Sequence, residues 1–215
     1  LTGLAVTVAF RAKIWNIGAE GQLFAGAITS YWAYTMFQGA PSFILIVMVI
    51  LSASIGGALY GGLAGYLKAK FSVNEVLSTV MLNYIIRYVL SFLLISGPWR
   101  DPSSFYQQSS RIIQAAKYPM LFGISRLHMG FAIALVLALV VYLFLTRTSL
   151  GYEIRSIGFN PKASRFKGIN VDRTIIIVMM ISGGIAGLAG AGELFGVHYR
   201  LKPDISHGFG FLGII

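Results

Sequence analysis

The chain has 215 residues, 56% of them hydrophobic and only 11% charged, and it carries a net charge of +10 with no cysteine. A soluble domain has about 25% charged residues, so this composition excludes an ordinary soluble domain and indicates a polytopic membrane protein. The positive charge does not indicate nucleic-acid binding, because the Lys and Arg residues lie in connections between apolar segments, and the lack of cysteine excludes disulfides and thiolate metal sites.

Several apolar segments follow one another along the chain, and a membrane-spanning helix needs about 20 mainly apolar residues. The first candidate, residues 23–37, is short, so its helix is expected to begin near Gly18 or to be broken within the membrane. Residues 1–10 resemble the end of an earlier span, and residues 208–215 resemble the start of a further one. The predicted fold is therefore all-α and polytopic, with about five complete helices and partial helices at both ends, as in a fragment. The predicted complete spans are 23–37, 43–67, 76–95, 129–145 and 175–197.

The basic residues in the connections predict an orientation. If successive connections alternate sides, ten Lys and Arg residues lie on one side and six on the other, with Arg87 inside a span. The positive-inside rule then places the 146–174 loop in the cytoplasm. The polar 97–128 segment is predicted to lie outside, with a short helix near 109–116.

The segment WNIGAEGQ, residues 15–22, places three polar side chains beside two glycines. A polar, glycine-interrupted segment at the mouth of a span can line a cavity with free backbone groups. It can equally be an ordinary loop in which Glu20 is solvated. The polar residues concerned are Asn16, Glu20 and Gln22.

A second polar cluster runs along the span that begins near residue 75. Glu75, Thr79, Asn83 and Arg87 are each four residues apart, which gives one polar stripe on a helix. A polar stripe in an apolar helix faces protein or water rather than lipid. The stripe, together with Asn74, is either the wall of a translocation path or a set of interhelical hydrogen bonds with Glu75 and Arg87 reaching to opposite ends.

A third candidate is Glu193, near the outer end of the last span. Its carboxylate could accept hydrogen bonds from sugar hydroxyls or pair with Arg200 as a structural anchor. No His, Asp and Glu set has metal-ligand spacing, and no nucleophilic triad or phosphate-binding glycine loop is recognisable. Catalysis by this chain is not expected.

Small residues recur every four positions in two of the spans. Side chains of this size let two helices approach closely. The close contact is expected within the subunit, or alternatively between subunits. The residues are Gly56, Gly57, Gly61, Gly62 and Gly65 in one span, and Gly183, Ala186, Gly187, Gly190, Gly192 and Gly196 in the other.

The 146–174 loop contains a short helix with both ends marked. Asn160 is a good N-cap, and Pro161 suits the first helical position. Gly168 supplies a left-handed stop about two turns later. Such a basic helix can be bound by a cytoplasmic partner or can lie on anionic lipid.

Five motifs in a fixed order carry a resemblance to a known family. They are WNIGAEGQ, KAKFSVNEVLSTVMLNYI, GPWRDP, TSLGYEIRSIGFNPKASRFKGINVDRT and SGGIAGLAGAGELFGVHYRL. Together they resemble the permease subunits of bacterial ABC importers for nucleosides and simple sugars, which are related to the branched-chain amino acid and ribose permeases. The likeness covers nearly the whole chain.

This resemblance implies a single transmembrane permease domain over residues 1–215, truncated at both ends, in the bacterial cytoplasmic membrane. It implies a second permease subunit, identical or homologous, an extracytoplasmic substrate-binding protein, and cytoplasmic ABC ATPase subunits that bind ATP and Mg. The chain itself would hold no cofactor and would not be an enzyme. It would move nucleosides or simple sugars by alternating access. An ion-coupled secondary transporter is the alternative, because it also uses polar groups in broken helices.

The resemblance also assigns the 146–174 loop as the cytoplasmic coupling loop. In KASRFKG, Ala163 and Gly168 match the coupling pattern Glu-Ala-Ala, three residues, Gly, while Lys162 and Ser164 replace the Glu and the second Ala. Residues 161–167 would then act as a rigid lever on the spans 129–145 and 175–197. The predicted coupling residues are Gly151, Glu153, Arg155, Gly158, Asn160, Pro161, Ala163 and Gly168. The predicted translocation-path residues are Asn16, Glu20, Gln22, Asn74, Glu75, Thr79, Asn83 and Glu193.

Overall fold

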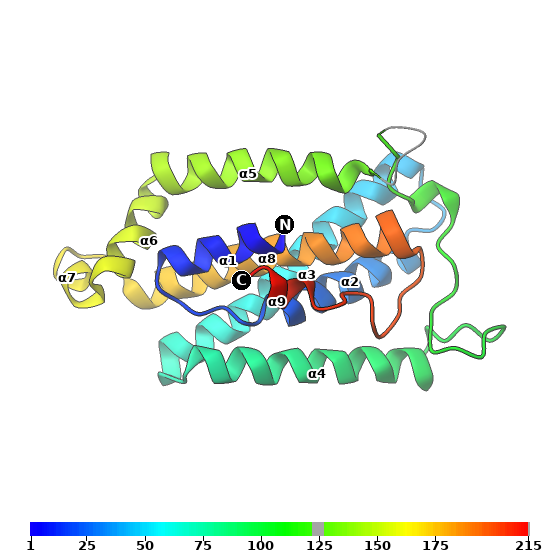
Figure 1. Cartoon of the computed structure of the whole chain (residues 1–215), viewed down its shortest axis with the longest axis horizontal. Coiled ribbons are helices and arrows are strands. Elements are labelled where there is room, and N and C mark those ends of the chain that lie inside the picture. Colours follow the sequence, from blue (N-terminus) through cyan, green and yellow to red (C-terminus); the bar gives the residue numbers. More distant parts are fainter. Residues whose placement is uncertain (122–126, 215) are drawn as a thin grey trace.

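The computed structural model of the chain describes residues 1–121 and 127–214, and these form a helical bundle without a named strand (Figure 1). The described residues include four helices that are long and apolar enough to cross a membrane. They are α3 (Ser42–Phe71), α4 (Glu75–Ile95), α5 (Met129–Arg147), and α8 (Val171–Gly192), which continues as the π-helix η2 (Glu193–His198). The predicted all-α, multi-pass membrane fold is confirmed.

The first predicted span, 23–37, is corrected by the structure, in which this segment belongs to helix α2 (Ala19–Met36). It is a regular helix of 18 residues, but it is not among the described helices that are apolar enough to cross a membrane. Glu20 and Gln22 lie in its first turn, and both are buried in the protein. The helix therefore begins inside the bundle, close to the expected Gly18, rather than at a membrane surface.

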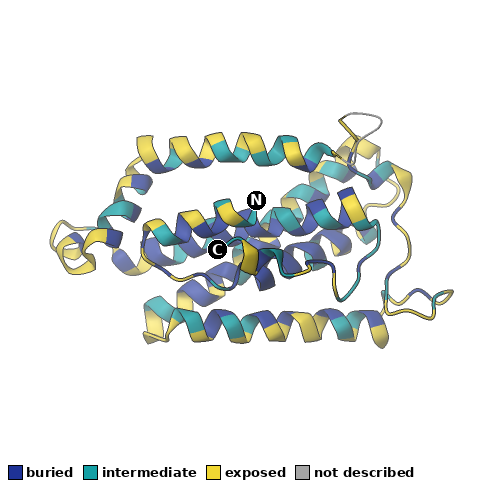
Figure 2. Ribbon diagram, viewed as in Figure 1, coloured by how far each residue is buried: buried dark blue, intermediate teal, exposed yellow. Residues whose placement is uncertain are grey.

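Helix α8 lies at the centre of the bundle and packs against α3, α2 and α1 (Thr2–Arg11). Figure 2 shows it as mostly buried, whereas the flanking helices α4 and α5 are banded with exposed residues. The contact between α3 and α8 is made by backbone, because a Cβ on Gly187 would overlap the carbonyl oxygen of Ala53. A Cβ on Gly26 of α2 would likewise overlap the backbone of Gly187. The predicted close packing of small residues within the subunit is confirmed.

Helices α3 and α5 end, and helices α4 and α8 begin, on one side of the bundle, next to the predicted basic connections (Figure 1). We call this side, which carries α6 (Ser149–Phe159) and α7 (Pro161–Phe166), the basic end (Figure 1). The other side, which carries the described parts of the 97–128 segment, is the opposite end; residues 122–126 of that segment lie outside the described residues. The helix expected near 109–116 is reduced to a short 3₁₀ turn, η1 (Gln114–Ala116).

The last described residues return into the bundle. Residues 199–208 lead from the opposite end to α9 (Phe209–Leu212), which packs against α2 and α1 (Figure 1). A Cβ on Gly210 would overlap the backbone of Glu20, so α9 touches the start of α2 directly. The first turn of α2 and helix α9 therefore meet inside the bundle, between the two ends of the long helices.

Candidate functional site

The polar segment 15–22 is held by a buried hydrogen-bond network. The side chains of Asn16 and Gln22 form a reciprocal amide pair, with N···O distances of 2.9 and 3.1 Å. Nδ2 of Asn16 also donates to Oγ of Ser182 at 2.8 Å, and Ser182 donates to the carbonyl oxygen of Ala5 at 2.6 Å. Asn16 and Ser182 have no exposed surface. These contacts join α1, α2 and α8, and the amide groups are used within the protein.

Asn83 of α4 joins the same network from the other side. Its Oδ1 accepts from the backbone N–H of Gly21 at 2.8 Å, and its Nδ2 donates to the carbonyl oxygen of Ile17 at 3.0 Å. Asn83 lies eight residues into α4, or about 12 Å from the start of that helix. The segment 15–22 therefore re-enters the bundle from the basic end, and the middle of the polar stripe makes interhelical hydrogen bonds, as one of its two interpretations requires. Thr79 bonds within its own helix, to the carbonyl oxygen of Glu75 at 2.6 Å.

Glu20 is not solvated, which corrects the loop interpretation of this segment. Only 3% of its surface is exposed. Its Oε2 accepts from Oγ of Ser206 and from the backbone N–H of Gly210, each at 2.7 Å. The carboxylate thereby ties the first turn of α2 to α9.

The ends of the stripe are occupied by ion pairs and a cap. Glu75 lies 2.6 Å from Nζ of Lys68 at the basic end, and Asn74 caps α4 by accepting from the N–H groups of residues 76 and 77. Arg87 lies 3.7 Å from Asp204 in the segment that leads to α9. Most of the predicted path residues therefore make hydrogen bonds or ion pairs within the protein.

A cavity of about 620 Å³ lies between α1, α2, α5, α8 with η2, and α9. Glu193 lines it, together with His128 at the start of α5; the other predicted path residues, all of them described, do not. The predicted pairing of Glu193 with Arg200 is wrong, because Arg200 lies 2.9 Å from Asp101. Oε2 of Glu193 lies 3.7 Å from Nε2 of His198. The remaining walls are mainly apolar and include Leu23, Phe131 and Phe209.

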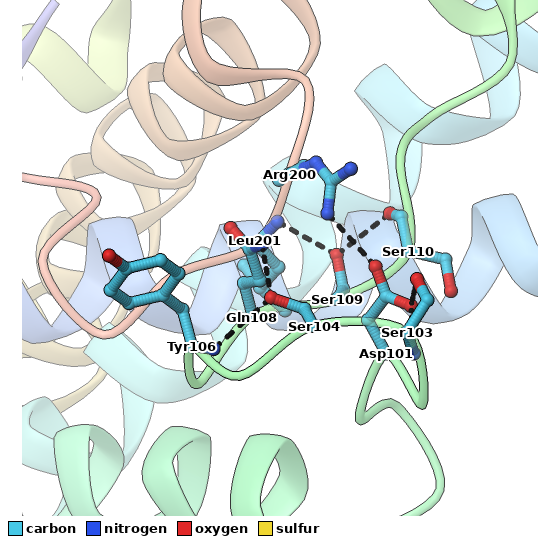
Figure 3. A network of polar contacts seen from close by, with 9 residues as sticks. All are labelled: Asp101, Ser103, Ser104, Tyr106, Gln108, Ser109, Ser110, Arg200 and Leu201. Carbon is cyan, nitrogen blue, oxygen red and sulfur yellow. Dashed lines mark hydrogen bonds and ion pairs between the residues drawn. The ribbon is translucent and has the colours of Figure 1, made fainter.

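The Arg200–Asp101 pair belongs to a polar network at the opposite end (Figure 3). Ser109 accepts a hydrogen bond from the N–H of Leu201 at 2.9 Å, and its own N–H donates to the carbonyl oxygen of Leu201 at 3.0 Å. Hydrogen bonds from the hydroxyl and N–H of Ser103, followed by the Arg200 guanidinium, hold the pKa of Asp101 below its ordinary value. The network fixes the 101–112 loop to the segment after η2.

Replacing Asp101 with asparagine is expected to loosen this loop at neutral pH. Since the folded-state pKa is depressed, the stabilisation by the carboxylate is complete above about pH 4 and is lost as the pH falls through the folded-state value. Chymotrypsin should therefore cleave the purified Asp101→Asn protein faster at the exposed Phe105 and Tyr106. Ser110→Ala, whose exposed hydroxyl takes no part in the network, is the control. Equal cleavage rates of wild type and Asp101→Asn would contradict the prediction.

The predicted coupling loop contains a helix that the sequence interpretation missed. Helix α6 begins after Thr148, whose Oγ1 accepts from the N–H of Gly151 at 3.0 Å. A signal was present, because a capping threonine precedes apolar residues at Leu150, Ile154 and Ile157, the spacing of one helix face. A Cβ on Gly158 would overlap the carbonyl oxygen of Arg11, so α6 packs directly on the end of α1.

Helix α7 has the predicted ends. Oδ1 of Asn160 accepts from the N–H groups of Lys162 and Ala163 at 3.0 and 3.1 Å, and Pro161 is the first helical residue. Gly168 has a φ of +82°, the left-handed conformation expected at the stop. The predicted cap, first residue and stop are confirmed.

The hairpin of α6 and α7 is tied to α8 and offers an exposed surface. Thr174 donates to Oε2 of Glu153 at 3.1 Å, and Arg165 lies 2.8 Å from Asp172. A groove of about 340 Å³ runs between the two helices, lined by Arg155, Asn160 and Ala163 among others. Phe159, which also lines the groove, is 85% exposed, and Phe166 at the end of α7 is 94% exposed.

Comparisons with known proteins identify similar transport permeases. A family model described as "Branched-chain amino acid transport system / permease component" matches residues 1–215. Similar curated proteins include the guanosine ABC transporter permease protein NupP of Bacillus subtilis, 36% identical over 217 residues, and the nucleoside ABC transporter permease protein NupB of Lactococcus lactis, 32% identical over 222 residues. The glucose ABC transporter permease protein TsgB13 of Haloferax volcanii is 31% identical over 224 residues.

Each of these alignments covers all of this chain. The chain spans 62%, 61% and 58% of the lengths of NupP, NupB and TsgB13, respectively. No solved structure matches the chain significantly.

Proposed function

Because the chain belongs to the family of branched-chain amino acid transport system permease components, we propose that it forms the transmembrane permease domain of an ATP-driven ABC importer for nucleosides or simple sugars. The match of the family model over residues 1–215 is the observation that carries this proposal. The relatives named for guanosine, nucleosides and glucose support the substrate class.

The assembly that follows from this proposal lies in the bacterial cytoplasmic membrane, with the basic end in the cytoplasm. Cytoplasmic ABC ATPase subunits bind ATP and Mg, a second permease subunit completes the path, and an extracytoplasmic binding protein delivers the solute. The excess of basic residues at the α6–α7 side supports this orientation.

The α6–α7 hairpin is the proposed contact for the ATPase subunits. Exposed aromatic side chains beside basic residues are typical anchors of protein interfaces, and Phe159 and Phe166 have this character. Motion of the hairpin reaches α8 through the Glu153–Thr174 and Arg165–Asp172 contacts. It reaches α1 through the backbone contact of Gly158, so the lever acts on one more helix than the sequence predicts.

The transport class is tested by uptake in cells that express the complete importer. We expect uptake of radiolabelled uridine or ribose to stop when ATP is depleted and to persist when a protonophore collapses the proton gradient. An ion-coupled secondary transporter would give the reverse pattern. Uptake that fails with the protonophore at normal ATP levels would overturn the proposal.

The docking surface gives a further prediction. Phe166→Ala and Ala163→Asp are expected to weaken ATPase binding, because one removes an exposed anchor and the other places a carboxylate in the groove. Loss of an interface anchor costs about 2 kcal/mol, or roughly 30-fold in affinity. Co-purification of the ATPase with the tagged permease measures the effect. Gly158→Arg is a poorer probe, since its side chain would strike Arg11 within the subunit.

The matched control is Phe105→Ala, which removes an equally exposed aromatic at the opposite end of the bundle. It should leave ATPase co-purification unchanged. If Phe166→Ala and Ala163→Asp both retain the ATPase at wild-type levels, the hairpin is not the docking surface.

A further inference from the structure

His128 lines the cavity beside α5 and η2, and its ring packs against two glycines. A Cβ on Gly196 would lie 2.5 Å from Cε1 of His128, and a Cβ on Gly130 would lie 2.6 Å from the same atom. Only residues without a side chain leave room for the ring. The imidazole of His128 is therefore held in one place in the cavity wall.

The hydrogen bonding of His128 fixes which ring nitrogen carries the proton. The backbone N–H of Gly130 donates to Nδ1 at 3.1 Å, so Nδ1 is the acceptor and the proton of the neutral ring lies on Nε2. Burial lowers the pKa of His128, which favours this neutral form at neutral pH. Nε2 makes no hydrogen bond with any of the described residues, and it remains available as a donor.

Glu193 supplies the complementary group in the same wall. It is the first residue of the π-helix η2, and π-helical turns inside α-helices are often found at functional sites. Its carboxylate lies 3.7 Å from Nε2 of His198, beyond hydrogen-bond distance. The carboxylate is therefore available as an acceptor, in contrast to that of Glu20, whose Oε2 already accepts two hydrogen bonds.

We propose that His128 and Glu193 are the specificity-determining polar contacts of a solute chamber in this cavity. Glu193 accepts hydrogen bonds from hydroxyl or N–H groups of the solute, and Nε2 of His128 donates to a solute oxygen or ring nitrogen. The apolar walls pack against the faces of a sugar or base ring. A volume of about 620 Å³ suits a neutral polar solute of nucleoside or monosaccharide size. This assignment rests on the proposed function.

Solute protection of a single cysteine tests the chamber directly, because the 215 residues contain no cysteine of their own. Ala134 lines the cavity, and Phe105 in the 101–112 loop, outside the cavity, is 98% exposed. In the complete importer, a charged thiol reagent should label Ala134→Cys and should react at least fivefold more slowly with saturating uridine or ribose. Phe105→Cys should be labelled as well, and its labelling should not respond to either solute.

The two polar contacts are tested in the Ala134→Cys background. Glu193→Gln and His128→Gln should each raise the solute concentration that gives half protection at least tenfold, with unchanged co-purification of the ATPase. Asp204→Asn, which changes a carboxylate outside the cavity, should leave that concentration unchanged. A shift with Asp204→Asn equal to that with Glu193→Gln would overturn the assignment of Glu193.

The outcomes separate this inference from the proposed function. If the wild-type importer takes up neither uridine nor ribose, the proposed substrate class fails. If it takes up a solute that does not protect Ala134→Cys, or if Glu193→Gln and His128→Gln both keep wild-type half protection, the chamber assignment alone fails.

Discussion

Replacing Gly187 with alanine is expected to lower the free energy of unfolding by about 3 kcal/mol, the upper end of the usual cost of overpacking a core. The added methyl group would overlap the carbonyl oxygen of Ala53 and lie 3.1 Å from Cα of Gly57. Both atoms belong to the backbone of α3, so no side-chain rotation relieves the contact. Helices α3 and α8 would have to separate, which would also disturb α2.

The measurement is the thermal unfolding midpoint of the detergent-solubilised protein, together with the yield of monodisperse material. The control is Gly192→Ala in the same helix, where the nearest atom to the new Cβ is 4.0 Å away. We expect the control to unfold at the wild-type temperature. Equal midpoints for Gly187→Ala and wild type would mean that the two helices do not touch as described.

Replacing Asn83 with leucine is expected to cost about 2–6 kcal/mol of folding free energy. The leucine leaves the N–H of Gly21 and the carbonyl oxygen of Ile17 without the bonds that Asn83 gives them. Each unsatisfied buried polar group costs about 1–3 kcal/mol. Segment 15–22 would lose its attachment to α4, and the start of α2 would no longer be fixed.

This variant distinguishes the two interpretations of the polar stripe. If Asn83 acts as a structural tie, Asn83→Leu unfolds at a lower temperature and uptake falls with the amount of folded protein. Tyr84→Leu, a change at an exposed neighbouring position, should alter neither property. If Asn83→Leu keeps the wild-type midpoint while uptake per folded molecule falls, Asn83 belongs to the translocation path instead.

Features that depend on local sequence could be predicted well. The cores of α3, α4, α5 and α8 follow from their long apolar runs, and their boundaries differ from the expected ones by a few residues. The ends of α7 follow from Asn160, Pro161 and Gly168, because capping depends on neighbouring residues in the chain.

Features that depend on tertiary contacts could not be predicted in the same way. Segment 15–22 has the composition of a loop, and its burial comes from partners 62 and 166 residues away in the sequence. The partner of Arg200 was misjudged for the same reason, since Asp101 lies 99 residues before it. Helix α6 was missed although its signal is local, because the charged composition of the 146–174 loop concealed the apolar spacing of its inner face.

The short helix α1 has a mechanical consequence. Its last residue, Arg11, bears on Gly158 of α6 through backbone, while Thr2 and Gly3 at its other end form part of the cavity wall. An α-helix of 10 residues is about 15 Å long and resists compression along its axis. Helix α1 therefore connects the α6–α7 hairpin with the wall of the cavity, so a displacement of the hairpin along the axis of α1 would also displace residues 2 and 3 in that wall.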